Sequence, residues 1–136
     1  AGAMGLMQLM PKTGHATARK YNIPLGNTRQ LYYPDKNIAI GSAYLQQVME
    51  QYDHNVILAS AAYNAGPHRV DRWLPEDEAR EADSWIALIP YRETRKYVQR
   101  ILAYIAIYDW RMDQPATRLQ AHMPAIQPAG SYTGTN

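Results

Sequence analysis

Apolar residues recur at three- and four-residue steps along most of this 136-residue chain, and no run alternates between apolar and polar residues. The first pattern places apolar side chains on one face of a helix, whereas alternation would indicate a strand. The hairpin dipeptides Asn-Gly and Asp-Gly are absent. The sequence therefore predicts an all-α fold with short connections.

Proline, glycine and asparagine mark the expected helix ends. Pro11 and Pro34 can each occupy a first helical turn, and Asn55 is a candidate N-cap. Gly66, followed by Pro67, is expected to stop the helix that Asn55 begins. Together these signals predict helices over residues 11–21, 34–52, 56–63 and 92–111, a short amphipathic segment over 68–74 and a short helical turn over 84–89.

Two of these helices have a predicted apolar face. In the second helix the face consists of Ile38, Gly41, Leu45, Val48 and Tyr52. In the last helix, one stripe consists of Tyr97, Ile101, Tyr104 and Tyr108, and Val98, Leu102 and Ile105 lie beside it. The five carboxylates within residues 75–83 instead indicate a solvated acidic segment.

From Asp113 onward apolar periodicity fades. This change predicts a domain over residues 1–112 and a tail over 113–136, mobile or draped over the surface.

Composition excludes several classes of function. Net charge is only +2 and no Lys/Arg block occurs, so nucleic-acid binding is not expected. Cysteine is absent and the four histidines are isolated, which excludes a thiolate zinc site and gives no metal-binding pattern. The longest strongly apolar run, residues 101–108, is far shorter than the ~20 residues that span a bilayer.

Three short segments remain as candidates for chemistry. In residues 5–11, Gln8 is an amide among apolar side chains, and it is either satisfied within the fold or faces a ligand. In residues 61–66, Tyr63 and Asn64 lie at a helix end, where they serve a C-cap, a ligand or both. Glu93 is four residues before Tyr97 on one helix face, and it is either a site residue or a helix-start carboxylate favoured by the macrodipole or by a cationic neighbour.

These three segments, in this order, resemble a known family. Residues 2–11 (GAMGLMQLMP) resemble the signature G-A-x-G-L-M-Q-I/L-M-P, residues 62–66 resemble A-Y-N-A-G, and residues 89–98 resemble I-P-F/Y-x-E-T-R-x-Y-V. All three are typical of the catalytic domain of soluble lytic transglycosylases. The resemblance covers roughly residues 1–110 and implies a helical, goose-type lysozyme-like fold.

The family resemblance implies cleavage of peptidoglycan glycan strands in the bacterial periplasm, without a cofactor. The bond cut joins N-acetylmuramic acid to N-acetylglucosamine, and the product has a 1,6-anhydromuramoyl end. A single glutamate acts first as general acid and then as general base, and apolar surroundings raise its pKa. An internal hydroxyl takes the place of water and of the second carboxylate of most glycosidases.

The family's catalytic glutamate lies in an E-S-x-F/W segment about a dozen residues before the first signature. We therefore expect it upstream of Ala1 in an N-terminally truncated domain, and we expect the chain alone to be inactive. An association with an N-terminal helical region is also implied. The family resemblance assigns substrate-binding roles in the cleft to Gln8, Met10, Tyr63, Asn64, Glu93 and Tyr97, whereas Met4 and Met7 are assigned to packing. Two alternatives are a hydrolase of the same fold and a non-catalytic glycan-binding module.

Overall fold

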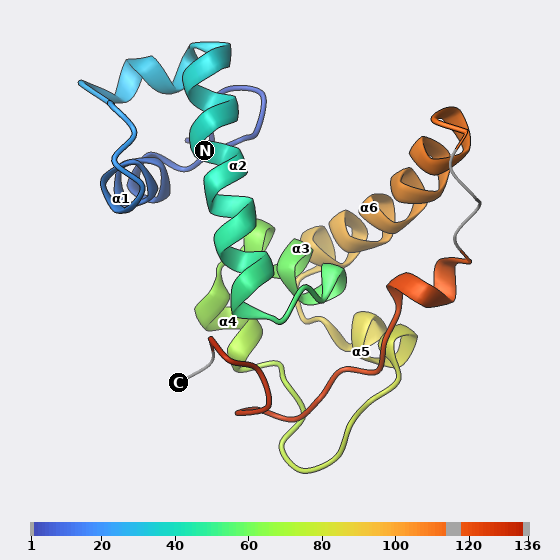
Figure 1. Ribbon diagram of the computed structural model, residues 1–136. Coiled ribbons are helices and arrows are strands. Elements are labelled where there is room, and N and C mark those ends of the chain that lie inside the picture. Colours follow the sequence, from blue (N-terminus) through green and yellow to red (C-terminus); the bar gives the residue numbers. More distant parts are fainter. Residues whose placement is uncertain (1, 114–117, 135–136) are drawn as a thin grey trace. The chain divides into compact units, whose positions relative to one another are not determined.

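The computed structural model describes residues 2–113 and 118–134 (Figure 1). Within them, β structure is limited to two isolated bridges, Met4 with Leu9 and Arg80 with Ile126. The α-helices are α1 (Pro11–Lys20), α2 (Pro34–Gln51), α3 (Val56–Ala65), α4 (Pro67–Asp71), α5 (Ala82–Leu88) and α6 (Arg92–Arg111). Two 3-10 helices, η1 (Thr28–Tyr32) and η2 (Leu119–His122), complete the described elements. The all-α prediction is confirmed.

The predicted helix ends agree with the structure to within two residues, except that α4 ends at Asp71 and not at Leu74. Pro11 is the first residue of α1. The last turn of α1 carries Arg19 and Lys20, whose positive charges interact favourably with the helix dipole. Asn55 caps α3, because its side-chain oxygen accepts hydrogen bonds from the backbone N–H groups of Ile57 and Leu58, at 3.1 Å each. Helix α6 begins two residues after Pro90.

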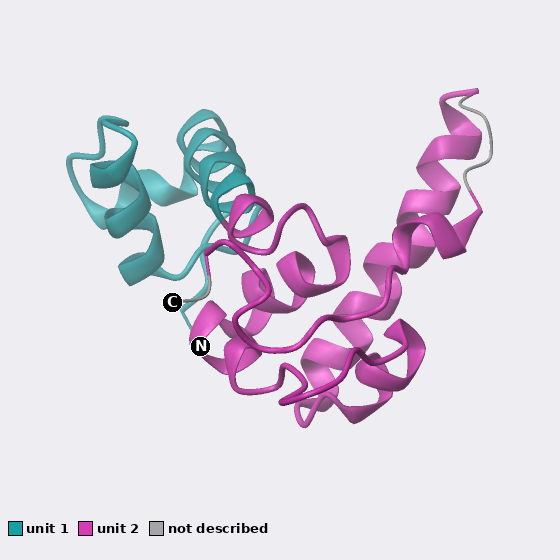
Figure 2. Ribbon diagram, turned by 60° about the horizontal axis from the view of Figure 1, so that its bottom comes forward, with its two compact units in different colours: residues 1–47 teal, residues 48–136 magenta. Residues whose placement is uncertain are grey.

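The chain divides into two compact units, residues 1–47 and residues 48–136 (Figure 2). In unit 1, α1 packs against η1 because Gly14 presents no side chain to Leu31. Leu31 and Ile40 are completely buried there, and Leu9 is nearly so. The loop before α1 is closed by paired hydrogen bonds between Met4 and Leu9, at 2.9 and 3.0 Å.

In unit 2, α3 is the central helix. Most of its residues are buried, and it packs against both α4 and α6, while α5 packs against α6. Small residues at Ala59, Ala61 and Ala62 allow neighbouring helices to approach α3 closely. The completely buried Ile57 and Leu58 anchor its first turn in the core.

The predicted apolar faces are only partly correct. In α2, Ile38 and Leu45 are 47% and 40% exposed, although Gly41, Val48 and Tyr52 of the predicted face are buried. The buried residues of α2 include instead Asn37, Ile40 and Tyr44. In α6, Tyr104 and Tyr108 of the predicted stripe are exposed. Val98 and Leu102, predicted beside the stripe, are buried together with Thr94. The acidic residues 76–81 lie in an exposed segment, as predicted.

The C-terminal part of the chain contacts residues of unit 2 that lie far from it in the sequence. Arg80 and Ile126 exchange backbone hydrogen bonds of 2.8 and 2.7 Å, and Ile126 is completely buried. The Tyr132 ring packs edge-on against Tyr52, with 6.0 Å between ring centroids. Residues 114–117 and 135–136 of the predicted tail lie outside the described residues, and the domain boundary at residue 112 stays a prediction.

No helix among residues 2–113 and 118–134 combines the length and the apolar character that a transmembrane span needs.

Candidate functional site

Unit 2 brings two of the three motifs into direct contact. Asn64 lies in the last turn of α3 and Thr94 in the first turn of α6. The Thr94 hydroxyl donates a 2.7 Å hydrogen bond to the side-chain oxygen of Asn64. Thr94 is only 2% exposed, so this bond is shielded from water on one side. Tyr63, Asn64, Glu93 and Tyr97 therefore lie on two helices that pack together.

Gly66 is the C-cap residue of α3. Its backbone has φ of 94° and ψ of 143°, and its N–H donates a 2.8 Å hydrogen bond to the carbonyl of Ala62. The positive φ favours glycine, although this ψ lies outside the left-handed helical region. Tyr63 and Asn64 are both half-buried at this helix end. The predicted end of the helix at Gly66 is confirmed, although the glycine lacks the left-handed helical conformation that is common at C-caps. A ligand role for Tyr63 and Asn64 stays a prediction.

Glu93 and Tyr97 lie one turn apart on α6 and differ in environment. Glu93 is exposed in the first turn, whereas Tyr97 is half-buried. Burial raises the pKa of Tyr97 from its ordinary value of 10.0. Its hydroxyl is protonated at neutral pH, as in any tyrosine, and can donate a hydrogen bond to a ligand. The chain has twelve Asp and Glu residues. All of them lie within residues 2–113, which the structure describes, and none is buried.

An aromatic and cationic group adjoins the same helix ends. The Arg69 guanidinium lies 5.3 Å from the centroid of the Tyr91 ring, and its Nη1 donates a 2.8 Å hydrogen bond to the carbonyl of Ala65. Tyr91 packs edge-on against Trp73, with 5.3 Å between ring centroids. Sequence reasoning did not find this group, because Tyr91 lies in a different segment from Arg69 and Trp73.

The first motif forms a tight loop in unit 1. Gln8 is exposed, with φ of 50°, and both its backbone N–H and its side-chain Nε2 donate to the carbonyl of Gly5, at 3.1 and 2.8 Å. Met10 is 50% exposed, and Leu6 is 72% exposed. Met4, in contrast, is buried, in agreement with its assignment to packing. Gln8 and Met10 belong to unit 1, whereas the other four predicted site residues belong to unit 2.

Asn37, near the start of α2, is a residue that sequence reasoning missed. It is completely buried, and its side chain forms three hydrogen bonds. Its Oδ1 accepts from the Met7 N–H at 2.7 Å, and its Nδ2 donates to the carbonyls of Met4 at 2.9 Å and Leu31 at 2.7 Å. Within unit 1, Asn37 therefore fixes the loop that carries Gln8. An asparagine in a first helical turn is ordinary in a sequence, so no local signal marked it.

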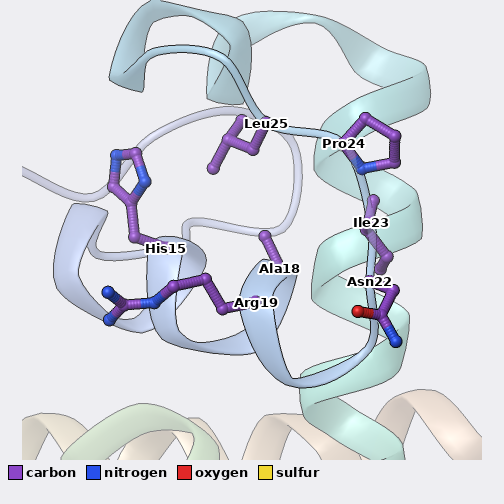
Figure 3. A pocket seen from close by; sticks show the side chains of 7 residues that line it. All are labelled: His15, Ala18, Arg19, Asn22, Ile23, Pro24 and Leu25. Carbon is purple, nitrogen blue, oxygen red and sulfur yellow. The ribbon is translucent and has the colours of Figure 1, made fainter.

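A cavity of about 350 Å³ lies elsewhere in unit 1, between α1 and the segment that follows it (Figure 3). His15 and Arg19 contribute its polar side chains from α1, and His15 Nε2 lies 2.9 Å from the Thr28 hydroxyl. None of the six predicted site residues lines this cavity. Its position therefore does not support it as the reaction centre.

Comparisons with known proteins agree with the motifs. The profile of the family described as "Transglycosylase SLT domain" matches residues 1–86, and that of the "Soluble lytic transglycosylase helical domain" matches residues 88–116. Since the first match covers more than half of the chain, the chain belongs to the transglycosylase SLT domain family. The predicted family and the lysozyme-like helical fold are confirmed.

Individual relatives give the same result. The soluble lytic murein transglycosylase of Escherichia coli K12 is 45% identical over 122 residues, which are 88% of this chain and 19% of that protein. An inactive glutamate-to-glutamine mutant of the Pseudomonas aeruginosa lytic transglycosylase is 54% identical, with a TM-score of 0.79, over 84% of this chain and 19% of that one. The 70-kDa soluble lytic transglycosylase of Escherichia coli is 38% identical, with a TM-score of 0.78, over 99% of this chain and 21% of that one. The chain thus spans about a fifth of the length of these relatives.

Proposed function

We propose that this chain forms most of the catalytic domain of a periplasmic peptidoglycan lytic transglycosylase. The enzyme cleaves the bond between N-acetylmuramic acid and N-acetylglucosamine and leaves a 1,6-anhydromuramoyl end. The observation that carries the proposal is the Thr94–Asn64 hydrogen bond, because it joins two family motifs at one pair of helix ends. Family membership and the names of the relatives, which are lytic murein transglycosylases, support the same reaction.

The proposed reaction needs one carboxylic acid in apolar surroundings. The acid gives its proton to the glycosidic oxygen as the bond between that oxygen and the muramoyl anomeric carbon breaks. The resulting carboxylate then accepts the proton of the muramoyl C6 hydroxyl, whose oxygen forms the new bond to the anomeric carbon. Water takes no part, so the product is lighter by one water than a product of hydrolysis.

We place the catalytic glutamate in a segment that precedes Ala1. Two observations support this placement. None of the twelve carboxylates, all within residues 2–113, lies in the buried environment that raises the pKa of a general acid. Among the described residues, Arg95 Nε in the E-T-R motif is buried and has no hydrogen-bond partner, although buried donors are nearly always paired. A further segment packed here would supply an acceptor.

The six predicted residues then have roles in binding the glycan. Tyr97, whose pKa is raised by burial, offers a hydroxyl donor to sugar oxygens. Gln8 offers an amide to the N-acetyl groups, and Met10 an apolar surface. Tyr63 and Asn64 contact the substrate or the catalytic carboxylate at the end of α3. Glu93 contacts the substrate from the first turn of α6.

The test uses the complete protein, including the segment before Ala1, with purified peptidoglycan sacculi as substrate. We expect release of 1,6-anhydromuropeptides, identified by mass. A reducing product that contains the added water would instead establish the alternative hydrolase, and binding without cleavage would establish the alternative glycan-binding module. The isolated 136-residue chain is the matched control, and we expect no cleavage from it.

A further inference from the structure

We propose that Asn37 is a positioning residue for glycan binding, because it holds the loop Met4–Leu9 in the conformation that presents Gln8. The inference rests on the proposed function, in which Gln8 contacts the substrate. Asn37 itself is completely buried and therefore acts only through the loop.

The side chain of Asn37 binds the loop at two points. Its Oδ1 accepts the Met7 N–H at 2.7 Å, and its Nδ2 donates to the Met4 carbonyl at 2.9 Å. The second Nδ2 proton goes to the Leu31 carbonyl at 2.7 Å, which ties the amide to η1. Both protons of the amide nitrogen are used, so the orientation of the amide is fixed. A loop held by one rigid amide has little freedom to move Gln8.

Two glycines make room for this arrangement. Gly5 has φ of 69°, and a Cβ atom there would collide with the Asn37 amide and with the Leu31 carbonyl oxygen. Gly41 lies one turn after Asn37 on α2, and a Cβ atom there would collide with Met7. The loop therefore reaches Asn37 only because both positions lack a side chain. This close contact, together with the positive φ, accounts for glycine at position 5 of this sequence.

The position of Gln8 follows from that of Gly5. The Gly5 carbonyl accepts from both the backbone N–H and the side-chain Nε2 of Gln8, which holds the exposed amide against the turn. Among the described residues, Gln8 Oε1 forms no hydrogen bond, so it is available to a donor such as the amide N–H of an N-acetyl sugar. Displacement of Gly5 would displace this acceptor.

A double-mutant cycle in the complete protein tests the proposal, with soluble uncrosslinked peptidoglycan strands as substrate. We expect Asn37→Ser and Gln8→Ala each to lower kcat/KM, chiefly by raising KM, on the order of tenfold to a hundredfold. Because Asn37 acts through Gln8, Asn37→Ser should have little further effect in the Gln8→Ala background. Additive effects of the two substitutions would overturn the proposal.

The matched control is Asn55→Ala, which removes the buried amide that caps α3 in unit 2. It should lower thermal stability while leaving KM unchanged. Hydrogen exchange gives an independent readout, in which Asn37→Ser accelerates exchange at Met7, Gln8 and Leu9 and Asn55→Ala does not. If the wild-type protein forms no anhydro product, the proposed function fails. Unchanged exchange in Asn37→Ser would overturn the role of Asn37 whatever the activity.

Discussion

At the scale of single residues, the bond between Thr94 and Asn64 sets the distance between two helix ends. The Thr94 side chain is 2% exposed, and its hydroxyl lies 2.7 Å from the Asn64 oxygen. A valine at position 94 has the same shape but no donor, so the Asn64 oxygen would lose its partner. Loss of this hydrogen bond costs more free energy than the small change in side-chain volume does.

We therefore expect Thr94→Val to lower the free energy of unfolding by about 1 kcal/mol. It should also lower kcat/KM in the complete protein, because Asn64 and Tyr63 would no longer be held at the beginning of α6. Urea denaturation and the release of anhydromuropeptides measure the two effects. Thr94→Ser is the matched control, since it keeps the hydroxyl, and it should retain most of the activity. Equal loss in both variants would contradict a role for the hydroxyl.

Sequence reasoning found the three motifs but not the residues that hold them. Gln8, Tyr63, Asn64 and Glu93 stand out because of their motif context. Asn37, in contrast, is 30 residues from Met7, and only the folded chain brings their groups together. Local patterns report periodicity and caps, whereas a buried amide with distant partners leaves no local pattern.

At the scale of elements, α6 explains why the predicted apolar side of a helix was buried only in part. Its 20 residues extend about 30 Å, whereas the 10 residues of α3 extend about 15 Å. The residues of α6 that are buried, Thr94, Val98 and Leu102, all lie in its first 11 positions. Tyr104 and Tyr108 lie farther along and are 53% and 62% exposed. Periodicity predicts a face, but it does not predict how far a neighbouring helix extends.

A comparison of two α6 substitutions in the isolated chain tests this assignment. Val98→Ala removes two buried methyl groups and should lower the free energy of unfolding by about 2 kcal/mol. Tyr108→Ala should change it by less than about 0.5 kcal/mol, because the ring is already mostly in water. Urea denaturation measures both. A larger loss for Tyr108→Ala than for Val98→Ala would contradict the buried face described above.

The C-terminal segment gives a pH prediction. Burial raises the pKa of Tyr132, Asp53 adds to the rise, and a hydrogen bond from the Gln127 N–H opposes it. The folded state therefore keeps this proton to higher pH than the unfolded state does. Its contribution to stability is complete below the unfolded pKa of about 10, and it is lost as pH rises through the folded-state pKa.

We expect the free energy of unfolding to fall above about pH 10 and to fall less steeply in Tyr132→Phe. Burial also raises the pKa values of Tyr44 and Tyr97, so part of the slope should remain in this variant. Denaturation at a series of alkaline pH values measures the slope. Tyr108→Phe, which changes an exposed tyrosine, is the control and should leave it unchanged. An identical slope in Tyr132→Phe would contradict the linkage.

At the scale of the whole molecule, the chain spans about a fifth of the length of its relatives. In the proposed function, its motifs bind the glycan and the catalytic glutamate lies in a segment before Ala1. Arg95 bears on that proposal. Its Nε is buried without a partner among the described residues, and an unpaired buried donor costs about 1–3 kcal/mol. In the proposed complete domain, the segment that carries the catalytic glutamate would lie against α6 and supply the missing acceptor.

This placement predicts that Arg95→Met lowers stability in the complete protein but not in the isolated chain. In the isolated chain it removes an unpaired donor and keeps much of the volume, so stability should stay the same or increase. In the complete protein it removes a paired donor and leaves a buried acceptor without a partner, so the free energy of unfolding should fall by about 1–3 kcal/mol. Denaturation of both forms, with Arg95→Lys as the variant that keeps the charge, measures the difference. A similar loss in both forms would mean that Arg95 is already satisfied within this chain, and that the segment before Ala1 packs elsewhere.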